Sequence, residues 1–303
     1  MILNKITNII TNRFLRTPDL RFLKNNIEKN KKIKHINFWL DKSSRNKNFR
    51  KYFFDPSRNS DSLPNYIFEN YKNSFSSEMF NSLKKNGIII IKNALPEIEK
   101  NEVLQLFYEL KNKNYSSRWN NIPSDVTDKS LGKVSRIRGM INIDQFYILK
   151  KYSELITKEV YGKKVEPTLE MHYIKLQEYE EETLSKGDTY LHTDRFVPHL
   201  KIFYTPTEIT LDDAPFEYAL SSHIIDENYK NFFKNAVNFD ETDNDSKKFI
   251  KKKIKVTVPQ NTLYIAFTNG FHKRNVFRKK GSERYMMYLQ YVKNFNKLNY
   301  IFS

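Results

Sequence analysis

Short segments that favour β-strands dominate the second half of the sequence, and this succession limits the possible folds more than any other feature. The segments are rich in β-branched and aromatic residues, which suit a pleated and half-buried surface. Turn sequences such as Asn269-Gly270 separate several of them. Many short strands with turns between them are typical of a β-sandwich or jelly roll. The expected strands span residues 168–178, 189–194, 200–205, 216–220, 254–258, 262–268 and 284–292.

The first half predicts helices, so we expect an α+β fold for the whole chain. Residues 75–85 have a helical pattern, the pair Asn86-Gly87 predicts a turn, and Ile88–Ile91 predicts a buried strand. Pro96 opens a second helix, and a third is expected at about 144–160. Helices therefore precede the strand-rich half. Two stretches break this pattern: a loop-rich one at 112–140, and a helical or irregular insertion at about 225–252.

The composition excludes whole classes of site. The chain has no cysteine, so disulfides, thiolate metal sites and a cysteine nucleophile are all excluded. Histidine, aspartate and glutamate are the strong metal ligands that remain. No stretch reaches the roughly 18 apolar residues that a membrane span needs. We therefore expect a cytoplasmic protein.

Positive charge is concentrated at the N-terminus. The net charge is +17, and residues 1–58 hold 15 Lys/Arg against 4 Asp/Glu. A basic segment attracts anionic surfaces, so a weak peripheral contact with a membrane through this end is one expectation, and a solvated tail is the alternative. Because most of the charge lies there, we do not expect a nucleic-acid groove in the rest of the chain. We expect a small-molecule substrate, and no obligate protein partner is evident from the sequence.

His192-Thr193-Asp194 lies at the end of an expected strand, and His272 follows another. Side chains at positions i and i+2 of a strand point to the same face, so His192 and Asp194 can reach one metal ion. Two histidines and one carboxylate are the ligand set that holds non-haem Fe(II) and leaves open positions. The alternative is structural: His192 would cap the strand and Asp194 would pair with Arg195.

Arg284 begins the last expected strand and has the planar fork that binds a carboxylate through two parallel hydrogen bonds. We expect it to hold the distal carboxylate of 2-oxoglutarate, with Arg274 and Arg278 as competitors. The other histidines carry weaker signals: we expect His223 to cap a loop and His172 to lie in the core or cleft.

The sequence resembles the phytanoyl-CoA dioxygenase-like family of Fe(II)/2-oxoglutarate-dependent oxygenases. The resemblance covers about residues 75–293 and implies a double-stranded β-helix (a cupin-like jelly roll) with flanking N-terminal helices. The matching elements are Asn86-Gly87-Ile88-Ile89-Ile90-Ile91-Lys92-Asn93, Leu191-His192-Thr193-Asp194, Asp212-Asp213-Ala214-Pro215-Phe216, Ser221-Ser222-His223 and the spacing from His272 to Arg284. The implied organisation is a basic, partly helical or irregular extension at 1–70 and an oxygenase domain at 71–303, with a helical part at 71–165, a jelly roll at 166–293 and the insertion at 225–252.

The resemblance implies that Fe(II) and 2-oxoglutarate activate O2 to hydroxylate a small organic, lipid-linked or carbohydrate-linked substrate, with release of succinate and CO2. It implies His192, Asp194 and His272 as metal ligands and catalytic residues. Arg284 would bind the cosubstrate, Tyr204 would flank it, and the stretches at 112–140 and 225–252 would form a lid. The presence of Asp194 favours hydroxylation over halogenation, because halogenating relatives have a small residue there.

The chain departs from the family pattern at three positions. Ala214 and Ser221 stand where glycine is frequent, and Met286 stands where Ser or Thr often helps to hold the cosubstrate. We expect Lys201, Tyr204 or Tyr288 to take over that help. The departures also leave open a different class of function, a catalytically altered binding module of the same fold.

Overall fold

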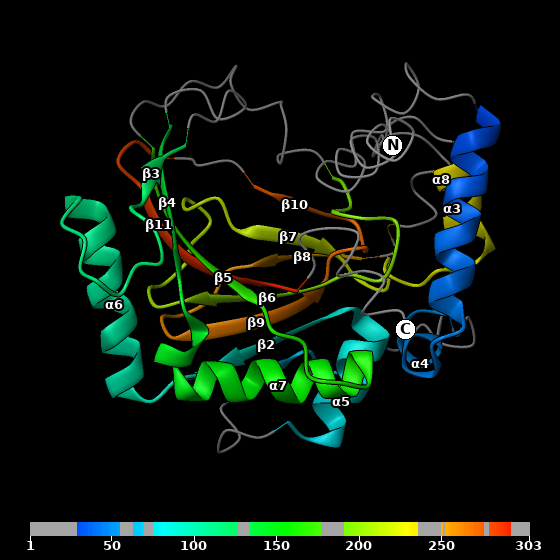
Figure 1. The fold of residues 1–303 in the computed structure, drawn as a ribbon, viewed down its shortest axis with the longest axis horizontal. Coiled ribbons are helices and arrows are strands. Elements are labelled where there is room, and N and C mark those ends of the chain that lie inside the picture. The colour runs from blue at the N-terminus through cyan, green and yellow to red at the C-terminus, as the bar shows by residue number, and fades with distance from the viewer. Residues whose placement is uncertain are drawn as a thin grey trace, which may run out of the picture.

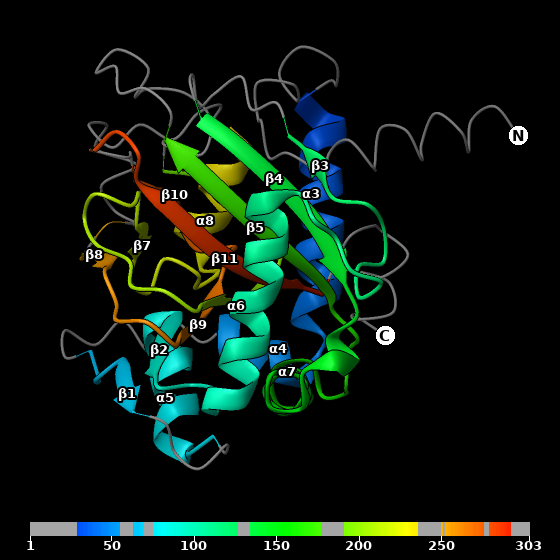
Figure 2. The same cartoon turned by 90° about the vertical axis from the view of Figure 1, so that its left-hand side faces the viewer.

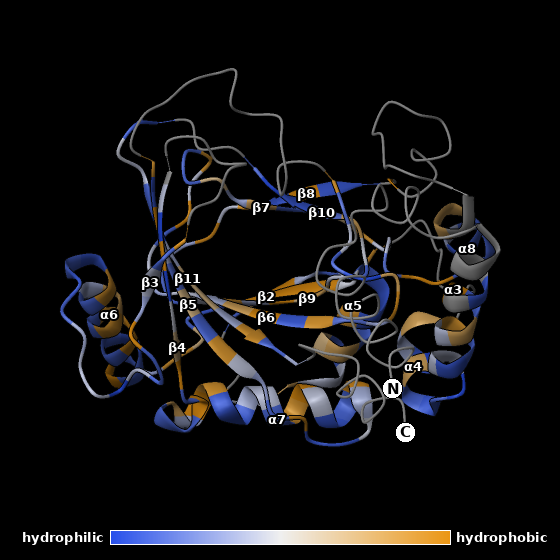
Figure 3. Ribbon diagram, turned by 45° about the horizontal axis from the view of Figure 1, so that its top comes forward, coloured by the Kyte–Doolittle hydropathy of each residue, from blue (hydrophilic) through white to orange (hydrophobic). Residues whose placement is uncertain are grey.

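Two β-sheets face one another, and helices cover the outer side of the larger sheet (Figure 1, Figure 3). The computed structural model describes residues 29–54, 63–69, 75–126, 134–176, 191–235, 250, 252–275 and 279–291. The large mixed sheet has eight strands in the order β1-β2-β9-β6-β11-β5-β4-β3, and the small sheet has three in the order β10-β7-β8. This arrangement fits a jelly-roll core.

The strands are β1 (Ile67–Glu69), β2 (Ile88–Lys92), β3 (Ser124–Asp125), β4 (Val134–Ile141), β5 (Thr168–Leu176), β6 (Leu200–Thr205), β7 (Phe216–Ala219), β8 (Lys253–Val256), β9 (Thr262–Phe267), β10 (His272–Arg274) and β11 (Glu283–Gln290). The helices are α3 (Lys29–Ser44), α4 (Lys47–Phe53), α5 (Ser77–Asn86), α6 (Glu97–Asn112), α7 (Tyr147–Tyr161) and α8 (Glu227–Asn235), with a 3-10 turn, η2, at Ile143–Gln145.

The run of four isoleucines in β2 is explained by burial on both of its faces. Ile88 and Ile90 belong to the apolar cluster between the two sheets. Ile89 and Ile91 belong to the larger cluster under the helices. Because successive side chains of a strand point to opposite faces, a strand buried on both sides needs a continuous apolar run.

The turn before β2 requires glycine. Helix α5 begins at a serine cap, where Ser76 Oγ accepts from the backbone N–H of Met79 at 3.1 Å. It ends at Gly87, whose φ is 79°. A Cβ atom there would lie 2.4 Å from both His223 Nδ1 and Tyr218 Oη. The Asn86-Gly87 turn thus lets the chain pass close to the small sheet.

The described part of the N-terminal segment packs into the main core. Asn46 caps α4, and Phe49, Tyr52 and Phe53 are fully buried in the larger apolar cluster. The ring of Phe53 lies 4.5 Å from that of Phe267 on β9. Residues 29–54 therefore contribute to the same core as the jelly roll, while residues 1–28 lie outside the described residues.

Most of the expected elements are present. Six of the seven strands expected in the second half appear as β5, β6, β7, β8, β9 and β11, and the strand expected at Ile88–Ile91 appears as β2. The three expected helices appear as α5, α6 and α7. The loop-rich interpretation of 112–140 is wrong in part, because β3 and most of β4 lie there and extend the large sheet. Helix α6 packs on β4 and β5 (Figure 2). Across the described ranges, no helix has the length and apolar character needed to cross a membrane.

Candidate metal centre

Main-chain pairing brings His272 beside the His192-Thr193-Asp194 segment. His192 and His272 exchange two reciprocal backbone hydrogen bonds, each of 2.8 Å. The backbone N–H of Asp194 donates to the carbonyl oxygen of Thr268 at 2.8 Å. Reciprocal bonding of this kind places two residues directly opposite each other on antiparallel strands. The spacing of the three side chains is therefore set by the backbone.

The side chains of His192, Asp194 and His272 converge on one point. One ligand atom from each lies within 4.8 Å of the other two. His272 Nε2 is 3.7 Å from Asp194 Oδ2, and the two histidine rings are 4.6 Å apart between centroids. Two imidazoles and one carboxylate that meet in this way could occupy one face of a metal ion, which is the ligand arrangement that suits Fe(II).

His272 is held in the form that a metal requires. Its Nδ1 lies 2.8 Å from the carbonyl oxygen of Gly270. Since a carbonyl can only accept, Nδ1 carries the proton and Nε2 presents its lone pair to the other ligands. Burial lowers the pKa of His272 to about 4, so the ring is neutral at pH 7.

A lysine stands beside the carboxylate. Lys201 Nζ lies 2.7 Å from Asp194 Oδ2, and His199 Nδ1 lies 3.8 Å from the same oxygen. Within the described residues, no donor meets this buried oxygen in hydrogen-bonding geometry. Burial opposes the charge of Asp194, but Lys201 and the histidines keep the pKa of its carboxyl well below the usual range. The carboxylate is thus ionised and available to a cation.

Arg284 is a buried cation on the face of β11 that points between the sheets, the same face as Met286. Its Nη1 donates to the carbonyl oxygen of Ala214 at 2.5 Å. Its Nε has no hydrogen-bond partner, and within the described residues no carboxylate pairs with the guanidinium. A buried charge without a counter-ion is costly, so the site suits an anionic ligand.

Aromatic rings connect Arg284 with the metal ligands. The ring of Phe216 lies 5.2 Å from that of His272 and 5.6 Å from that of Tyr264. Burial raises the pKa of Tyr264 and the nearby Arg284 guanidinium lowers it, which places the two side chains together. The triad and Arg284 are therefore linked by a chain of aromatic side chains between the two sheets.

The expectation for Tyr204 is wrong. Lys201 and Phe203 point between the sheets, so Tyr204 points to the opposite face of β6. Its hydroxyl donates to Asn261 Oδ1 at 3.0 Å, under the helices. Tyr204 is thus part of the outer core and cannot contact a cosubstrate beside the triad.

The structure places most of the other residues that the sequence singled out. His223 Nε2 lies 3.1 Å from the carbonyl oxygen of Lys84 in the last turn of α5, so its ring contacts a helix end and is not among the three converging ligands. Met286 is buried with Tyr264, whose hydroxyl lies 3.6 Å from its sulfur. Tyr288 is on the same face of β11, and Arg278 lies outside the described residues. The carbonyl groups of Gly270 and Ala214 are the contacts that the sequence did not reveal, because any residue type supplies a carbonyl.

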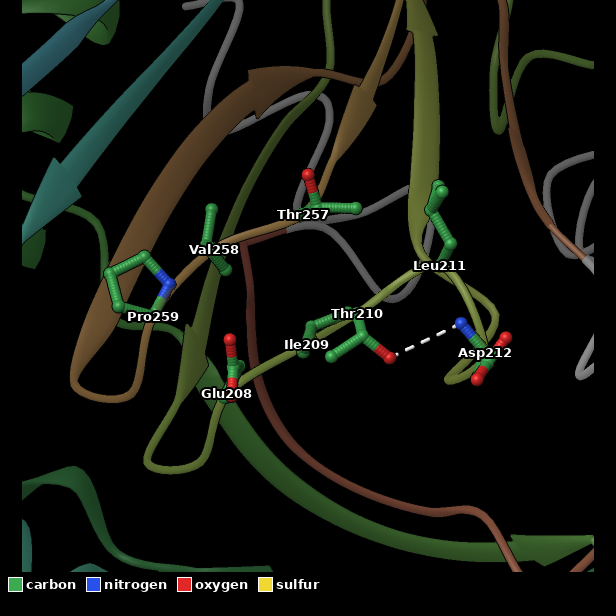
Figure 4. A pocket seen from close by; sticks show the side chains of 8 residues that line it. All are labelled: Glu208, Ile209, Thr210, Leu211, Asp212, Thr257, Val258 and Pro259. Carbon is green, nitrogen blue, oxygen red and sulfur yellow. Dashed lines mark hydrogen bonds between the residues drawn. The ribbon is translucent and has the colours of Figure 1, made fainter. Parts of the chain in front are cut away.

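A surface pocket lies elsewhere. It is lined by Glu208, Ile209, Thr210, Leu211, Asp212, Thr257, Val258 and Pro259 (Figure 4). These residues follow the C-terminal end of β6 and precede β9, whereas Lys201, which contacts Asp194, lies near the other end of β6. The pocket is therefore separate from the candidate metal centre.

Comparisons with known proteins give distant likenesses of fold. No protein-family model and no curated protein sequence matches the chain. Similar solved structures include the non-heme alpha ketoglutarate dependent epimerase SnoN from nogalamycin biosynthesis, with 12% identity over 71% of this chain and 83% of that chain and a TM-score of 0.46. HygX from Streptomyces hygroscopicus, with nickel, 2-oxoglutarate and hygromycin B bound, has 13% identity over 71% and 86%, and a TM-score of 0.41. EctD from S. alaskensis with bound Fe has 13% identity over 79% and 82%, and a TM-score of 0.45.

Likeness at this level does not transfer a function from one protein to another. Membership of the phytanoyl-CoA dioxygenase-like family stays a prediction from the sequence. The arrangement of this chain's own side chains is what indicates its chemistry.

Proposed function

We propose that the protein is an Fe(II)/2-oxoglutarate-dependent dioxygenase that hydroxylates a C–H bond of a small organic substrate. One observation carries the proposal: the three converging ligands, His192, Asp194 and His272, are linked through aromatic side chains to Arg284, a buried cation that has no acidic partner among the described residues. A metal and a dicarboxylate are the two ligands that would satisfy both groups.

The finer description of the fold belongs to this proposal. We propose a double-stranded β-helix in which the segment at His192 acts as the fourth strand of the small sheet, beside β10. Its bridge to His272 supports this, and so does the order β10-β7-β8 of the other three strands. Strands β5, β11, β6 and β9 would be the matching four of the large sheet.

The residues divide between the two proposed ligands. His192, Asp194 and His272 would hold the iron, and Arg284 would bind the far carboxylate of 2-oxoglutarate through its fork. When bound, iron and 2-oxoglutarate supply the reaction with O2 that oxidises a substrate C–H bond and releases succinate and CO2. The protein contributes position and a dry surrounding.

The chain's own groups prepare the site before any ligand arrives. The Gly270 carbonyl keeps the proton of His272 on Nδ1. Lys201 keeps Asp194 ionised and at the same time balances its charge. Part of the surrounding is apolar, since Phe203, Phe216 and Tyr264 pack against one another between the sheets. A water-poor interior of this kind strengthens electrostatic contacts with a bound anion.

The test is formation of succinate from 2-oxoglutarate, together with metal binding. The intact protein should bind Fe(II) or Co(II) at one site per chain and release succinate when a substrate is supplied. His192→Ala and Asp194→Ala should lose both properties. Asp125→Ala is the matched control, because Asp125 forms an exposed ion pair with Lys113. Unchanged metal binding in both ligand variants would disprove the assignment.

A binding module of the same fold is the second candidate, and the departures at Ala214, Ser221 and Met286 favour it. Anaerobic titration of the Fe(II) protein with 2-oxoglutarate separates the two. A weak visible charge-transfer band supports the oxygenase, because it requires the cosubstrate to chelate the metal. Binding of metal without this band supports the module.

A further inference from the structure

The interior face of the large sheet has an apolar half and a charged half. On β2, β6 and β9, interior side chains join the apolar cluster formed with the small sheet. Figure 3 shows the small sheet above this half. On β4, β5 and the C-terminal end of β11, charged and polar side chains lie on the interior face, beside apolar ones such as Ile174 and Leu176. We call the set Arg136, Arg138, Glu170, His172 and Gln290 the polar strip.

Strand register places the polar strip on one face. Arg138 pairs with His172 across β4 and β5, and His172 pairs with Met286 on β11. Since Met286 belongs to the interior cluster, Arg138 and His172 face the interior as well. Arg136 and Glu170 lie two residues away along their strands and share that face. The opposite face of β4 is apolar, because Ile137 and Ile141 pack against the outer core.

The side chains of the polar strip contact one another. Arg138 Nη2 lies 3.1 Å from Glu170 Oε1, and His172 Nε2 lies 3.5 Å from Glu170 Oε2. Arg136 Nη2 lies 2.9 Å from His172 Nδ1. Burial lowers the pKa of His172 to about 4, so its ring is neutral at pH 7 and accepts from Arg136. The strip thus contains two arginine cations and one carboxylate.

The polar strip leads to the metal ligands. Gln290 donates from Nε2 to Glu170 Oε2 at 3.4 Å, and it is the cross-strand partner of Lys201. Lys201 contacts Asp194. The Glu170 side chain is 3% exposed and that of Arg138 is 43% exposed, so the strip reaches solvent at Arg138. The strip therefore runs from the metal centre outward along one wall.

A buried carboxylate such as Glu170 contributes little to stability even when paired, because its desolvation offsets the attraction. Charged groups held in place beside a candidate metal centre are better explained by ligand recognition. Arginine suits this role, since its fork binds carboxylate and phosphate groups. Glu170 would keep Arg138 in position, and His172 would do the same for Arg136.

We propose that the polar strip is the substrate site and that it selects a molecule carrying an acidic group, a carboxylate or a phosphate, held by Arg136 and Arg138. This rests on the proposed function, because the triad would then oxidise a carbon near that group. The cosubstrate stays with Arg284, and the substrate approaches from the β4 side of the large sheet.

The test measures binding of three probes to the full-length protein saturated with Fe(II) and 2-oxoglutarate under anaerobic conditions. Butyrate and phenyl phosphate represent the two acidic groups, and butyramide is the neutral comparison. We expect one or both acids to bind and butyramide not to bind. Arg136→Gln and Arg138→Gln should each weaken acid binding about tenfold, the effect of one charge-assisted hydrogen bond. Arg118→Gln, which removes an arginine paired with Glu109 outside the strip, should have no effect.

The outcomes separate this proposal from the proposed function. Loss of acid binding with unchanged affinity for Fe(II) and 2-oxoglutarate supports the substrate site. Unchanged acid binding in both variants overturns it, and so does a loss confined to 2-oxoglutarate affinity. Failure of the intact protein to bind Fe(II) or 2-oxoglutarate overturns only the proposed function, since the probes can still be titrated against the metal-free protein. If Arg136→Gln does not fold, the more exposed Arg138→Gln decides, with Arg138→Lys expected to keep part of the binding.

Discussion

Arg284 donates a hydrogen bond of 2.5 Å to the carbonyl oxygen of Ala214, and Ala214 itself has a φ of 53°. Left-handed backbone at a residue other than glycine costs about 1 kcal/mol. Ser221, the other position where the resemblance led us to expect glycine, has a φ of 65°. At both positions the backbone has the left-handed conformation that glycine adopts most easily. At Ala214 that conformation aims a carbonyl at the arginine.

Substitution of Ala214 should show whether this left-handed position requires a small side chain. Ala214→Gly relieves the strain but removes a buried methyl group, and each effect is worth about 1 kcal/mol. We expect its free energy of unfolding to stay close to that of the natural chain. Ala214→Val should be destabilised by roughly 2 kcal/mol or more, because a β-branched residue fits left-handed backbone poorly. Urea unfolding measures both, and a stable valine variant would contradict the strain.

Arg284 should control the affinity for 2-oxoglutarate and leave the affinity for metal unchanged. Arg284→Gln removes two charge-assisted hydrogen bonds, so we expect the Kd for 2-oxoglutarate to rise about 100-fold. Arg284→Lys should be nearly as weak, since a lysine keeps the charge but lacks the fork. Calorimetric titration with 2-oxoglutarate and with Co(II) checks both parts. A parallel loss of Co(II) binding would mean that the arginine supports the fold instead.

Lys201 should weaken metal binding in the absence of the cosubstrate. Its ammonium group lies 2.7 Å from Asp194 Oδ2, where it repels an incoming dication. We expect Lys201→Met to bind Co(II) about tenfold more tightly, a free-energy change of about 1.4 kcal/mol. Lys111→Met is the control, because Lys111 pairs with Glu283 outside the interior. Equal affinities for the natural chain and Lys201→Met would refute this effect.

Glu283 should make stability depend on acid pH. Burial alone would raise its pKa, but Lys111, Tyr285 and Tyr173 lower it to about 2. A carboxyl whose pKa is lower in the folded state stabilises fully above its unfolded value and loses that contribution as pH falls. We expect Glu283→Gln to cost about 1 kcal/mol at pH 7, since the ion pair is partly exposed. The difference should shrink between about pH 4.5 and pH 2. Urea midpoints across this range measure it, and a constant difference would exclude the linkage.

The sequence predicted the strands in which buried positions are occupied by apolar residues that favour β-structure. Segments such as β9 and β11 are dense in apolar β-formers and have the expected bounds within about two residues. Strand β4 escaped prediction because its interior face carries Arg136 and Arg138, so it lacks a continuous apolar run. The functional assignment of the charged face depends on strand register, which the sequence does not reveal.

The candidate site was predictable in its ligands but not in its surroundings. The i, i+2 spacing of His192 and Asp194 and the position of His272 were enough to bring three donors together. Tyr204 was misplaced because the assignment came from resemblance, whereas the alternation along β6 sends its side chain outward. Carbonyl groups such as that of Gly270 leave no mark in a sequence, since every residue has one.

The reciprocal main-chain bonds between His192 and His272 have a consequence for engineering the centre. The main-chain bonds fix the distance between the two positions. The side chain at either position can therefore be exchanged while the backbone spacing stays the same. A shortened side chain at Asp194 would then leave a gap of defined size, into which a small added anion could be introduced. Such chemical complementation would allow the experimenter to choose which added anion completes the ligand set.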